Sequence, residues 1–452
     1  MTGREISPID GRYSAETTVL SDYFSEWALI KNRVRIEIEW LITTSKSDWF
    51  EEIRTLSQSE ILFLRDLVKN FDDSSVLKIK EIEKTTNHDV KAVENYLRGA
   101  LKNTPMTDVV EFIHFGCTSD DINNLSYALM LKDGISNVWT SKAEEMMSLV
   151  SQAANEYRNI PMISRTHGQA ATPTTIGKEL AVFVYRWQRQ LTYLKSIKYL
   201  GKFNGVVGNF NAQVVAYPDA PWEDISRNFV EGLGLGYNPL TTQIEPHDYM
   251  AECFHGINRF NNITLNFDRD MWMYISLGYF KQHVIGEETG SSTMPHKVNP
   301  INFENSEANV GLSNSILSHL VDKLQVSRLQ RDLSDSSALR NIGTAIAHSY
   351  ISIHNAITGF KRLAVNKEAI DADISSSWEV LAEAIQTVMR KYGCDEPYEA
   401  LKEFTRGKKI DKEDIREFIT NLEIPKEDKN RLLALTPDGY IGIAPGLVDW
   451  IK

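Results

Sequence analysis

Cysteine and long apolar runs are both scarce in this chain of 452 residues. Its three cysteines, Cys117, Cys253 and Cys394, lie far apart and in no metal-ligand spacing, which argues against a disulfide scaffold and a zinc protein. No segment reaches the unbroken apolar length of a membrane-spanning helix, and the first residues lack the apolar block of a secretory signal. These absences predict a cytoplasmic protein that does not associate with membranes.

Positive charge is also in short supply. Lysine and arginine total 49 against 61 aspartates and glutamates, giving a net charge of −12. An acidic surface disfavours nonspecific binding to nucleic acid, because such binding depends on neutralising phosphates. A small anionic ligand would therefore need a local basic pocket set against the overall field.

Several common catalytic motifs are missing from the sequence. There is no GxxxxGK[ST] phosphate loop, no GxGxxG after a strand, no HExxH and no GxSxG nucleophile elbow. Their absence excludes the usual nucleotide-hydrolysing, dinucleotide-dependent and zinc-protease classes. Acid/base chemistry on an anionic substrate, without metal or cofactor, remains.

What the sequence does contain is mainly helical periodicity. Apolar residues recur at three- and four-residue steps over 135–158 and from 247 to about 280, and two more long helices fit 304–330 and 335–362. Strand signals are sparse, and the best of them predicts a small hairpin over 203–217. The expected fold class is all-α, with a long central helical bundle.

The length and the breaks in the pattern predict three domains. The segment 102–105 interrupts the helical pattern, and beyond about residue 362 the helices shorten while charge rises. We therefore expect an N-terminal helical domain over 1–110, a central bundle over 111–362 and a C-terminal helical domain over 363–452.

The segment Gly290–Pro300 is the most informative stretch of the chain. It reads GSSTMPHKVNP, and its prolines suit neither a helix interior nor a central strand. Such a loop offers hydroxyls, an imidazole, a cation and an amide to one anion. The alternative is an ordinary polar surface loop.

Four further segments are rich in polar groups: 85–90, 117–121, 164–169 and 331–340. Helix capping is the alternative interpretation for most of them, although in 85–90 it would not account for His88. The two arginines and three serines of 331–340 match the needs of a phosphate or carboxylate site as well as those of a capped helix start. From the residues alone, a histidine would be the expected catalytic base.

Taken together, these segments resemble the fumarase/aspartase superfamily of lyases. The stretch 290–300 is similar to its signature GSSxMPxKxNP, and the resemblance extends from about residue 7 to the C-terminus, including 7–13 and 241–246. The best match is the bacterial branch that acts on succinylated purine nucleotides. It implies a three-domain all-α fold, a homotetramer with active sites shared between subunits, and no cofactor or metal.

The resemblance implies β-elimination of fumarate from succinyl-AMP and from SAICAR in purine biosynthesis. Ser291 would be the base, with Ser292 the next candidate, and His167 the acid that protonates the leaving nitrogen. Lys297 would favour the serine alkoxide, and Glu304 would orient His167. Alternatives are another superfamily lyase, such as argininosuccinate lyase or aspartase, and a catalytically silent helical scaffold.

The remaining expected site residues bind substrate. For the phosphate and ribose they are Arg12, Tyr13, Arg331, Ser336 and Arg340. For the base and its nitrogen they are Asn87, His88, Asp89 and Gln243. For the succinyl carboxylates they are Thr118, Ser119, Lys297 and Asn299. Ser292, Val298 and Asn305 complete the expected binding set.

Overall fold

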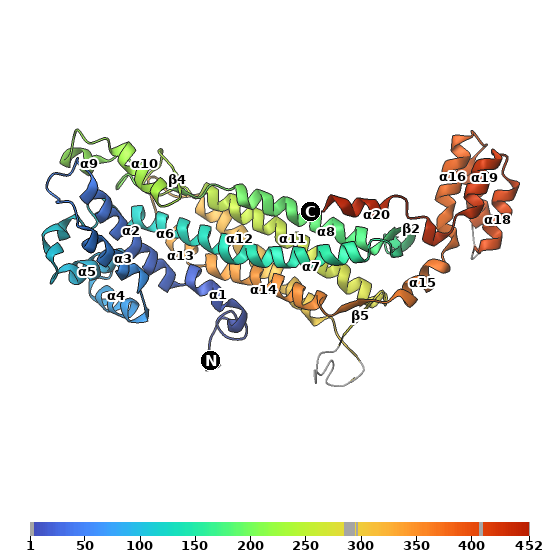
Figure 1. The fold of residues 1–452 in the computed structure, drawn as a ribbon, viewed down its shortest axis with the longest axis horizontal. Helices are drawn as coiled ribbons and strands as arrows, with labels where there is room; N and C mark the ends of the chain where they lie inside the picture. The colour runs from blue at the N-terminus through green and yellow to red at the C-terminus, as the bar shows by residue number, and fades with distance from the viewer. Residues whose placement is uncertain (1–3, 284–293, 295–296, 406–409, 452) are drawn as a thin grey trace. The chain divides into compact units, whose positions relative to one another are not determined.

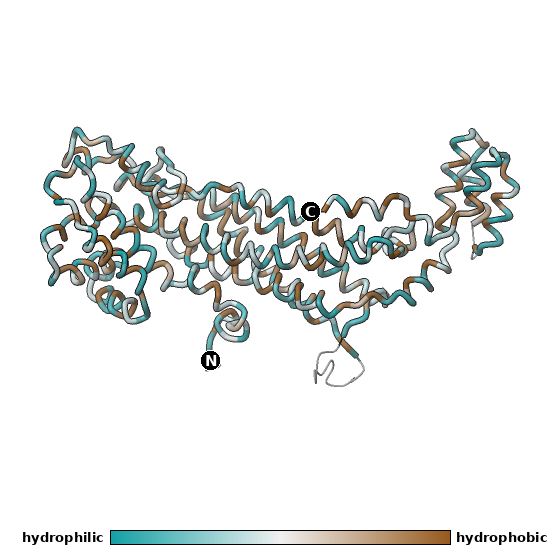
Figure 2. The backbone as a smooth tube through the Cα atoms, viewed as in Figure 1, coloured by the Kyte–Doolittle hydropathy of each residue, from teal (hydrophilic) through white to brown (hydrophobic). Residues whose placement is uncertain are grey.

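Helices dominate the computed structural model, which describes residues 4–283, 294, 297–405 and 410–451. In these residues the strands form three two-stranded sheets and the rest of the regular structure is helical (Figure 1). The all-α class is therefore confirmed. None of the described helices is long and apolar enough to cross a membrane, and Figure 2 shows apolar and polar residues interspersed along them.

The chain divides into two compact units. The first comprises residues 1–143, 190–262 and 308–354, and the second comprises 144–189, 263–307 and 355–452. The expected boundaries near residues 110 and 362 stay a prediction.

The elements of the first unit are α1 Ser14–Phe24, α2 Glu26–Lys46, α3 Gln58–Lys69, α4 Asp73–Thr86, α5 Asp89–Leu101, the 3-10 helix η1 Pro105–Phe112, α6 Ser119–Gly134, the π-helix η2 Ile135–Trp139, β3 Leu200–Gly201, α9 Asn211–Ala216, α10 Trp222–Gly232, β4 Gly236–Tyr237 and α13 Ser334–Leu339. Five long helices contribute residues to both units: α7 Thr140–Glu156, α8 Ile176–Ser196, α11 Asp248–Ser276, α12 Ile301–Leu324 and α14 Ile342–Phe360.

The elements of the second unit are β1 Pro161–Thr166, β2 Gln169–Thr175, β5 Phe280–Gln282, β6 Leu363–Val365, α15 Lys367–Ser375, η3 Trp378–Leu381, α16 Ala382–Lys391, α17 Pro397–Thr405, α18 Lys412–Asn421, α19 Lys426–Ala434, η4 Pro437–Gly439, α20 Ala444–Leu447 and η5 Val448–Trp450. Strands β1 and β2 pair antiparallel, as do β5 and β6.

Helix α11 packs against several other long helices. In the first unit the buried Asn261 amide donates to Ser313 of α12 at 3.1 Å and its carbonyl accepts from Ser349 of α14 at 2.7 Å. In the second unit Phe267 packs edge-on against Phe183 of α8, with ring centroids 5.4 Å apart. Buried polar groups that are fully paired define one packing arrangement, since a slipped helix would leave them unsatisfied.

The predicted long helices are largely confirmed. The helix expected from 247 to about 280 spans Asp248–Ser276, and the one expected over 304–330 begins and ends slightly earlier, as Ile301–Leu324. The helix expected over 335–362 is interrupted, because α13 ends at Leu339 before α14 begins. The apolar stripe over 135–158 is helical, with a π-helical turn at its start.

The hairpin predicted over 203–217 is wrong. That segment forms a loop followed by α9, and two of its backbone N–H groups, of Asn204 and Gly205, donate to the buried Asp121 carboxylate instead of to a strand. Among the described residues, β1 and β2 form a hairpin in which Thr166 pairs with Gln169 across a two-residue turn.

Candidate active site

The corner between α4 and α5 is shaped by the Asn87-His88-Asp89 segment. Asn87 ends α4 in the left-handed conformation (φ 49°), which asparagine tolerates better than most residues. His88 is the N-cap of α5, and its Nδ1 accepts the Lys91 N–H at 3.2 Å. The expectation that capping would not account for His88 is therefore wrong, because the histidine is itself the cap.

Asp89 is held by two arginines. The buried Arg33 of α2 donates through Nη2 to Asp89 Oδ2 at 2.7 Å, and the more exposed Arg340 lies 3.4 Å from the same oxygen. Burial alone would raise the pKa of Asp89, but Arg33, the Val90 N–H and Arg340 outweigh it and lower that pKa overall. Asp89 is therefore anionic near neutral pH.

The start of α6 faces the same corner. The Ser119 hydroxyl lies 3.4 Å from His88 Nε2, and the Thr118 N–H donates to Asp121 at 2.8 Å, as in a capping box. The capping alternative for this segment is correct for Thr118. Beneath it, Asp121 forms a fully buried ion pair with Lys202.

Arg331 lies next to this helix start. Its Nη1 donates to Gln243 Oε1 at 3.0 Å, and its Nη2 is 3.9 Å from Asp120, the residue after Ser119. Burial raises the pKa of Asp120 to about 6, although Lys202 and Arg331 oppose the shift. Arg331 is thus a half-buried cation whose guanidinium is oriented by the Gln243 carbonyl and the Asp120 carboxylate.

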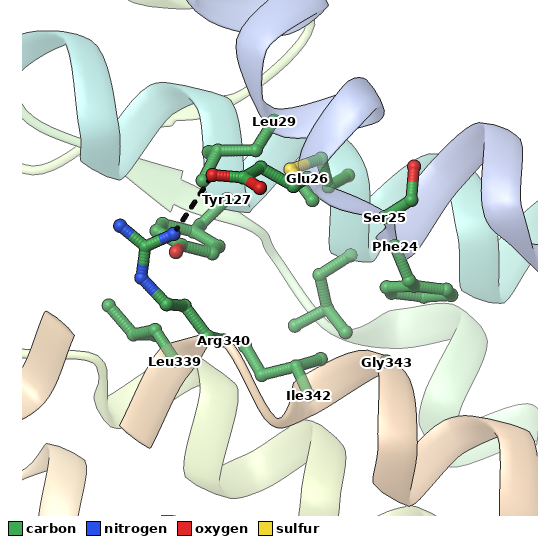
Figure 3. A pocket seen from close by; sticks show the side chains of 11 residues that line it. Phe24, Ser25, Glu26, Leu29, Tyr127, Leu339, Arg340, Ile342 and Gly343 are labelled. Carbon is green, nitrogen blue, oxygen red and sulfur yellow. Dashed lines mark ion pairs between the residues drawn. The ribbon is translucent and has the colours of Figure 1, made fainter. Parts of the chain in front are cut away.

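Of the other predicted phosphate and ribose contacts, Arg12 and Arg340 are exposed, whereas Tyr13 and Ser336 are partly buried. Ser336 lies in the short helix α13, and Arg12 lies beside the Tyr13 ring at the start of α1, 6.0 Å from its centroid. Figure 3 shows Arg340 beside Glu26, with which it makes a long ion pair of 3.8 Å, at the edge of a pocket also lined by Tyr127.

His167 stands at the tip of the β1–β2 hairpin, in the second unit. His167 and Gly168 form the two-residue turn, and both have positive φ, 53° and 74°. That combination is characteristic of the type I′ turn favoured by the twist of a hairpin. Nearby, Arg165 is fixed by an ion pair of 2.6 Å with Asp373, so the exposed imidazole is carried on an anchored strand.

The other predicted catalytic residues of the second unit lie around the start of α12. Glu304 is in the first turn, and its carboxylate accepts the Trp272 indole N–H at 3.2 Å. The pairing of Glu304 with His167 stays a prediction. Lys297 is exposed, while Ser291 and Ser292 lie outside the described residues.

The structure also describes three neighbouring residues that are predicted to bind substrate. The Val298 carbonyl accepts a hydrogen bond from Gln282 at 3.0 Å, and the Asn305 amide donates to Asn355 at 3.3 Å. Asn299 is half-buried just before α12. In the described ranges no group of three or more His, Cys, Asp and Glu residues could hold a metal ion.

Sequence reasoning missed three residues that support the site. Arg33 and the Asp121–Lys202 pair are almost fully buried. For Arg33 a signal was available, since it interrupts the apolar face formed by Ile30 and Val34 of α2, and buried charges require partners. Lys202 carries no such signal, because the loop around it has no periodicity.

Comparison with known proteins identifies the family. The profile of the family described as "Lyase" matches residues 11–312, and that described as "Adenylosuccinate lyase C-terminal" matches residues 327–441. The chain is 50% identical to the adenylosuccinate lyase of Vibrio cholerae over 98% of both chains, and 52% identical to that of Legionella pneumophila over 98% of this chain and 97% of the other. The Escherichia coli adenylosuccinate lyase is 50% identical over 99% of this chain and 98% of its own.

Solved structures agree on the fold. A fumarate lyase from Mesorhizobium sp. BNC1 superposes with a TM-score of 0.77, at 17% identity, over 96% of this chain and 97% of that one. The 3-carboxy-cis,cis-muconate lactonizing enzyme from Pseudomonas putida gives 0.72 at 18% identity, over 97% of both chains. With the helical fold, both profiles and the full-length relatives in agreement, this chain belongs to the adenylosuccinate lyase family and is an enzyme of the lyase class.

Proposed function

We propose that this protein catalyses β-elimination of fumarate from adenylosuccinate, giving AMP, and from SAICAR, giving AICAR. The observation that carries the proposal is the convergence of expected binding residues from separate segments: Asp89 meets Arg340, His88 meets Ser119, and Gln243 meets Arg331. Family membership over almost the whole chain supports the same reaction. The two arginines supply the local positive charge that an anionic nucleotide needs on an acidic protein.

The chemistry requires one base, one acid and fixed cations. A proton leaves the succinyl carbon beside a carboxylate, the bond between the other succinyl carbon and the purine-side nitrogen breaks, and that nitrogen takes up a proton. The intermediate carbanion is spread over the adjacent carboxylate, so electrostatic stabilisation governs the barrier. Ser291 would take the first proton and His167 would deliver the second, with Lys297 and Glu304 supporting them.

Substrate turnover tests the proposed reaction directly. Purified protein should cleave adenylosuccinate and SAICAR, which can be monitored by the absorbance change as fumarate leaves. It should leave argininosuccinate and aspartate intact. Turnover of argininosuccinate would contradict the proposal, and so would the absence of turnover of all four compounds.

The roles of His167 and Ser291 need variants that keep the local backbone. His167→Asn is preferable to alanine, because Asn-Gly is the favoured pair for a type I′ turn and retains the hairpin while removing the imidazole. We expect a loss in turnover of about a hundredfold or more, with AMP binding retained. Ser291→Ala should lose as much, whereas Ser292→Ala should not, and the reverse order would move the base to Ser292.

We also propose a cytoplasmic homotetramer whose active sites are shared between subunits. The exposure of the His167 tip in its own chain supports this, since an imidazole that acts in acid catalysis is normally enclosed with its substrate. Mixing inactive Ser291→Ala and His167→Asn proteins should restore activity if base and acid come from different chains. Absence of any recovery after confirmed subunit exchange would place both residues in one chain.

A further inference from the structure

Arg33 is a buried cation for which the proposed reaction has no stated use. It lies within α2, where its side chain is 4% exposed and Ile30 and Val34 beside it are buried. A guanidinium removed from water is costly unless every part of its fork is paired. Its partners therefore indicate why it is there.

The guanidinium joins two helix starts. Its Nε donates to Asn123 Oδ1 in α6 at 2.8 Å, and its Nη2 donates to Asp89 Oδ2 in the first turn of α5 at 2.7 Å. The planar fork keeps these two acceptors at a defined separation, which the single ammonium of a lysine would not.

Those two helix starts carry both groups of expected contacts that flank the bond to be broken. The start of α5 carries His88 and Asp89, expected on the base side, and the start of α6 follows Thr118 and Ser119, expected on the carboxylate side. We propose that Arg33 is a positioning residue, whose guanidinium sets the distance between the base-binding and carboxylate-binding segments. This inference rests on the proposed function, because the two segments that Arg33 joins are expected to bind that substrate. We call the Arg33 guanidinium with its acceptors Asp89 and Asn123 the clamp.

The charge of Arg33 has a second consequence at Asp89. The other groups that face this carboxylate or are electrostatically coupled to it are Arg340 at 3.4 Å, His88 at 3.9 Å, the Val90 N–H and the Tyr127 hydroxyl of α6, with Glu26 sharing Arg340. Without Arg33, the more exposed Arg340 would remain as the arginine beside Asp89 among the described residues, so the pKa of Asp89 would rise. An acid limb of activity that depends on ionised Asp89 should then move to higher pH.

The test compares four variants of the full-length enzyme. Arg33→Lys keeps the charge but not the fork, Arg33→Gln removes the charge, and Asn123→Ala opens one side of the clamp while keeping Arg33. The matched control is Arg98→Lys, since Arg98 also joins two elements: it donates to Glu94 of its own helix α5 at 3.0 Å and to Glu111 of η1 at 2.9 Å. The measurements are kcat and KM for adenylosuccinate, the Kd of AMP by calorimetry, and the pH profile of kcat/KM.

We expect Arg33→Lys and Asn123→Ala to raise the KM for adenylosuccinate by about tenfold, with a smaller change in kcat, as lost uniform binding does. The Kd of AMP should change less, because AMP lacks the succinyl carboxylates. Arg98→Lys should stay within about twofold. Arg33→Gln should also shift the acid limb upward, which a purely structural role would not do. If the Arg33 variants fail to fold, the KM of Asn123→Ala for adenylosuccinate tests the inference in their place.

KM values for adenylosuccinate that match that of Arg98→Lys, in folded Arg33→Lys and Asn123→Ala proteins, would overturn the inference alone. Wild-type protein that neither cleaves adenylosuccinate nor binds AMP would overturn the proposed function, and the inference with it. The two failures are therefore distinguishable in the same set of measurements.

Discussion

The Lys202 ammonium and the Asp121 carboxylate form an ion pair of 2.8 Å in which the side chains are 0% and 1% exposed. Asp121 also accepts backbone N–H groups from Thr118 and Asn204, so one carboxylate ties the start of α6 to a loop about eighty residues further along. This pair therefore helps to hold in place the start of α6, which carries Ser119 and the expected carboxylate-binding segment.

Asp121→Asn should destabilise the protein by about 3–5 kcal/mol, because it leaves the Lys202 ammonium buried without its counter-charge. The measurement is the thermal unfolding midpoint at one fixed protein concentration, since assembly affects that midpoint. Glu81→Gln is the control. It breaks an ion pair whose side chains are both 72% exposed, and should leave the midpoint unchanged. A small effect of Asp121→Asn would show that the pair contributes little.

The stability contributed by Asp120 should fall with rising pH. Burial raises its pKa from 3.8 to about 6, so the folded state holds the proton more tightly than the unfolded state does. Its favourable contribution is complete below about pH 4 and is lost as pH rises towards about 6, a change on the order of 3 kcal/mol. Asp120→Asn should remove this dependence.

The check on Asp120 is a comparison of unfolding midpoints for wild type and Asp120→Asn between pH 4 and 7. The difference should move in favour of the variant as pH rises, whatever other groups titrate in both proteins. A difference independent of pH would contradict the elevated pKa.

Gly168→Ala and Gly99→Ala should shift stability in opposite directions. Neither added Cβ would meet an atom within 4 Å, so only the backbone conformation differs between the two sites. Gly168 has φ +74°, where alanine costs about 1–2 kcal/mol, whereas Gly99 lies inside helix α5, where alanine should add about 0.5–1 kcal/mol. Thermal unfolding would measure both.

Gly168→Ala should also lower kcat, because it disturbs the turn that carries His167. Gly99→Ala, which lies away from the hairpin in the chain, should keep wild-type kcat. Unchanged turnover in Gly168→Ala would contradict a role for the hairpin tip in the reaction.

Arg331→Gln should weaken AMP binding by about tenfold or more, because it removes a half-buried cation that would donate charge-assisted hydrogen bonds to phosphate. Arg328→Gln is the control, since that arginine is 82% exposed and pairs only loosely, at 3.8 Å, with Asp332. Calorimetric titration with AMP would separate them. Equal affinities for the two variants would remove Arg331 from the expected phosphate contacts.

The parts of the fold that follow from local periodicity were predictable from the sequence. The long helix α11 is one example, because its apolar residues repeat over eight turns and its length is set by that repeat. The hairpin expected over 203–217 failed for the opposite reason. Its glycines and short apolar runs are typical of turns between short strands. The loop is instead held by hydrogen bonds to the Asp121 carboxylate, which is distant in the sequence, and no local pattern reveals these bonds.

The candidate site was predictable through its motifs more than through its geometry. The motifs brought Asp89, Ser119 and Arg331 into consideration, and the structure joins each to other expected residues. The support beneath them, such as the Arg33 fork, depends on tertiary neighbours separated by up to ninety positions, and spacing in the sequence does not encode such distances.

The cap formed by His88 settles which hydrogen bond that imidazole offers a ligand. Because Nδ1 accepts the Lys91 N–H, the neutral ring must carry its proton on Nε2, the nitrogen that faces Ser119. If His88 contacts the substrate base as proposed, the ligand would meet an N–H at this point and would have to present a lone pair to it. A purine ring nitrogen without hydrogen would satisfy that demand, whereas an N–H at the same place would leave two donors opposed, so the helix cap would help to select the base.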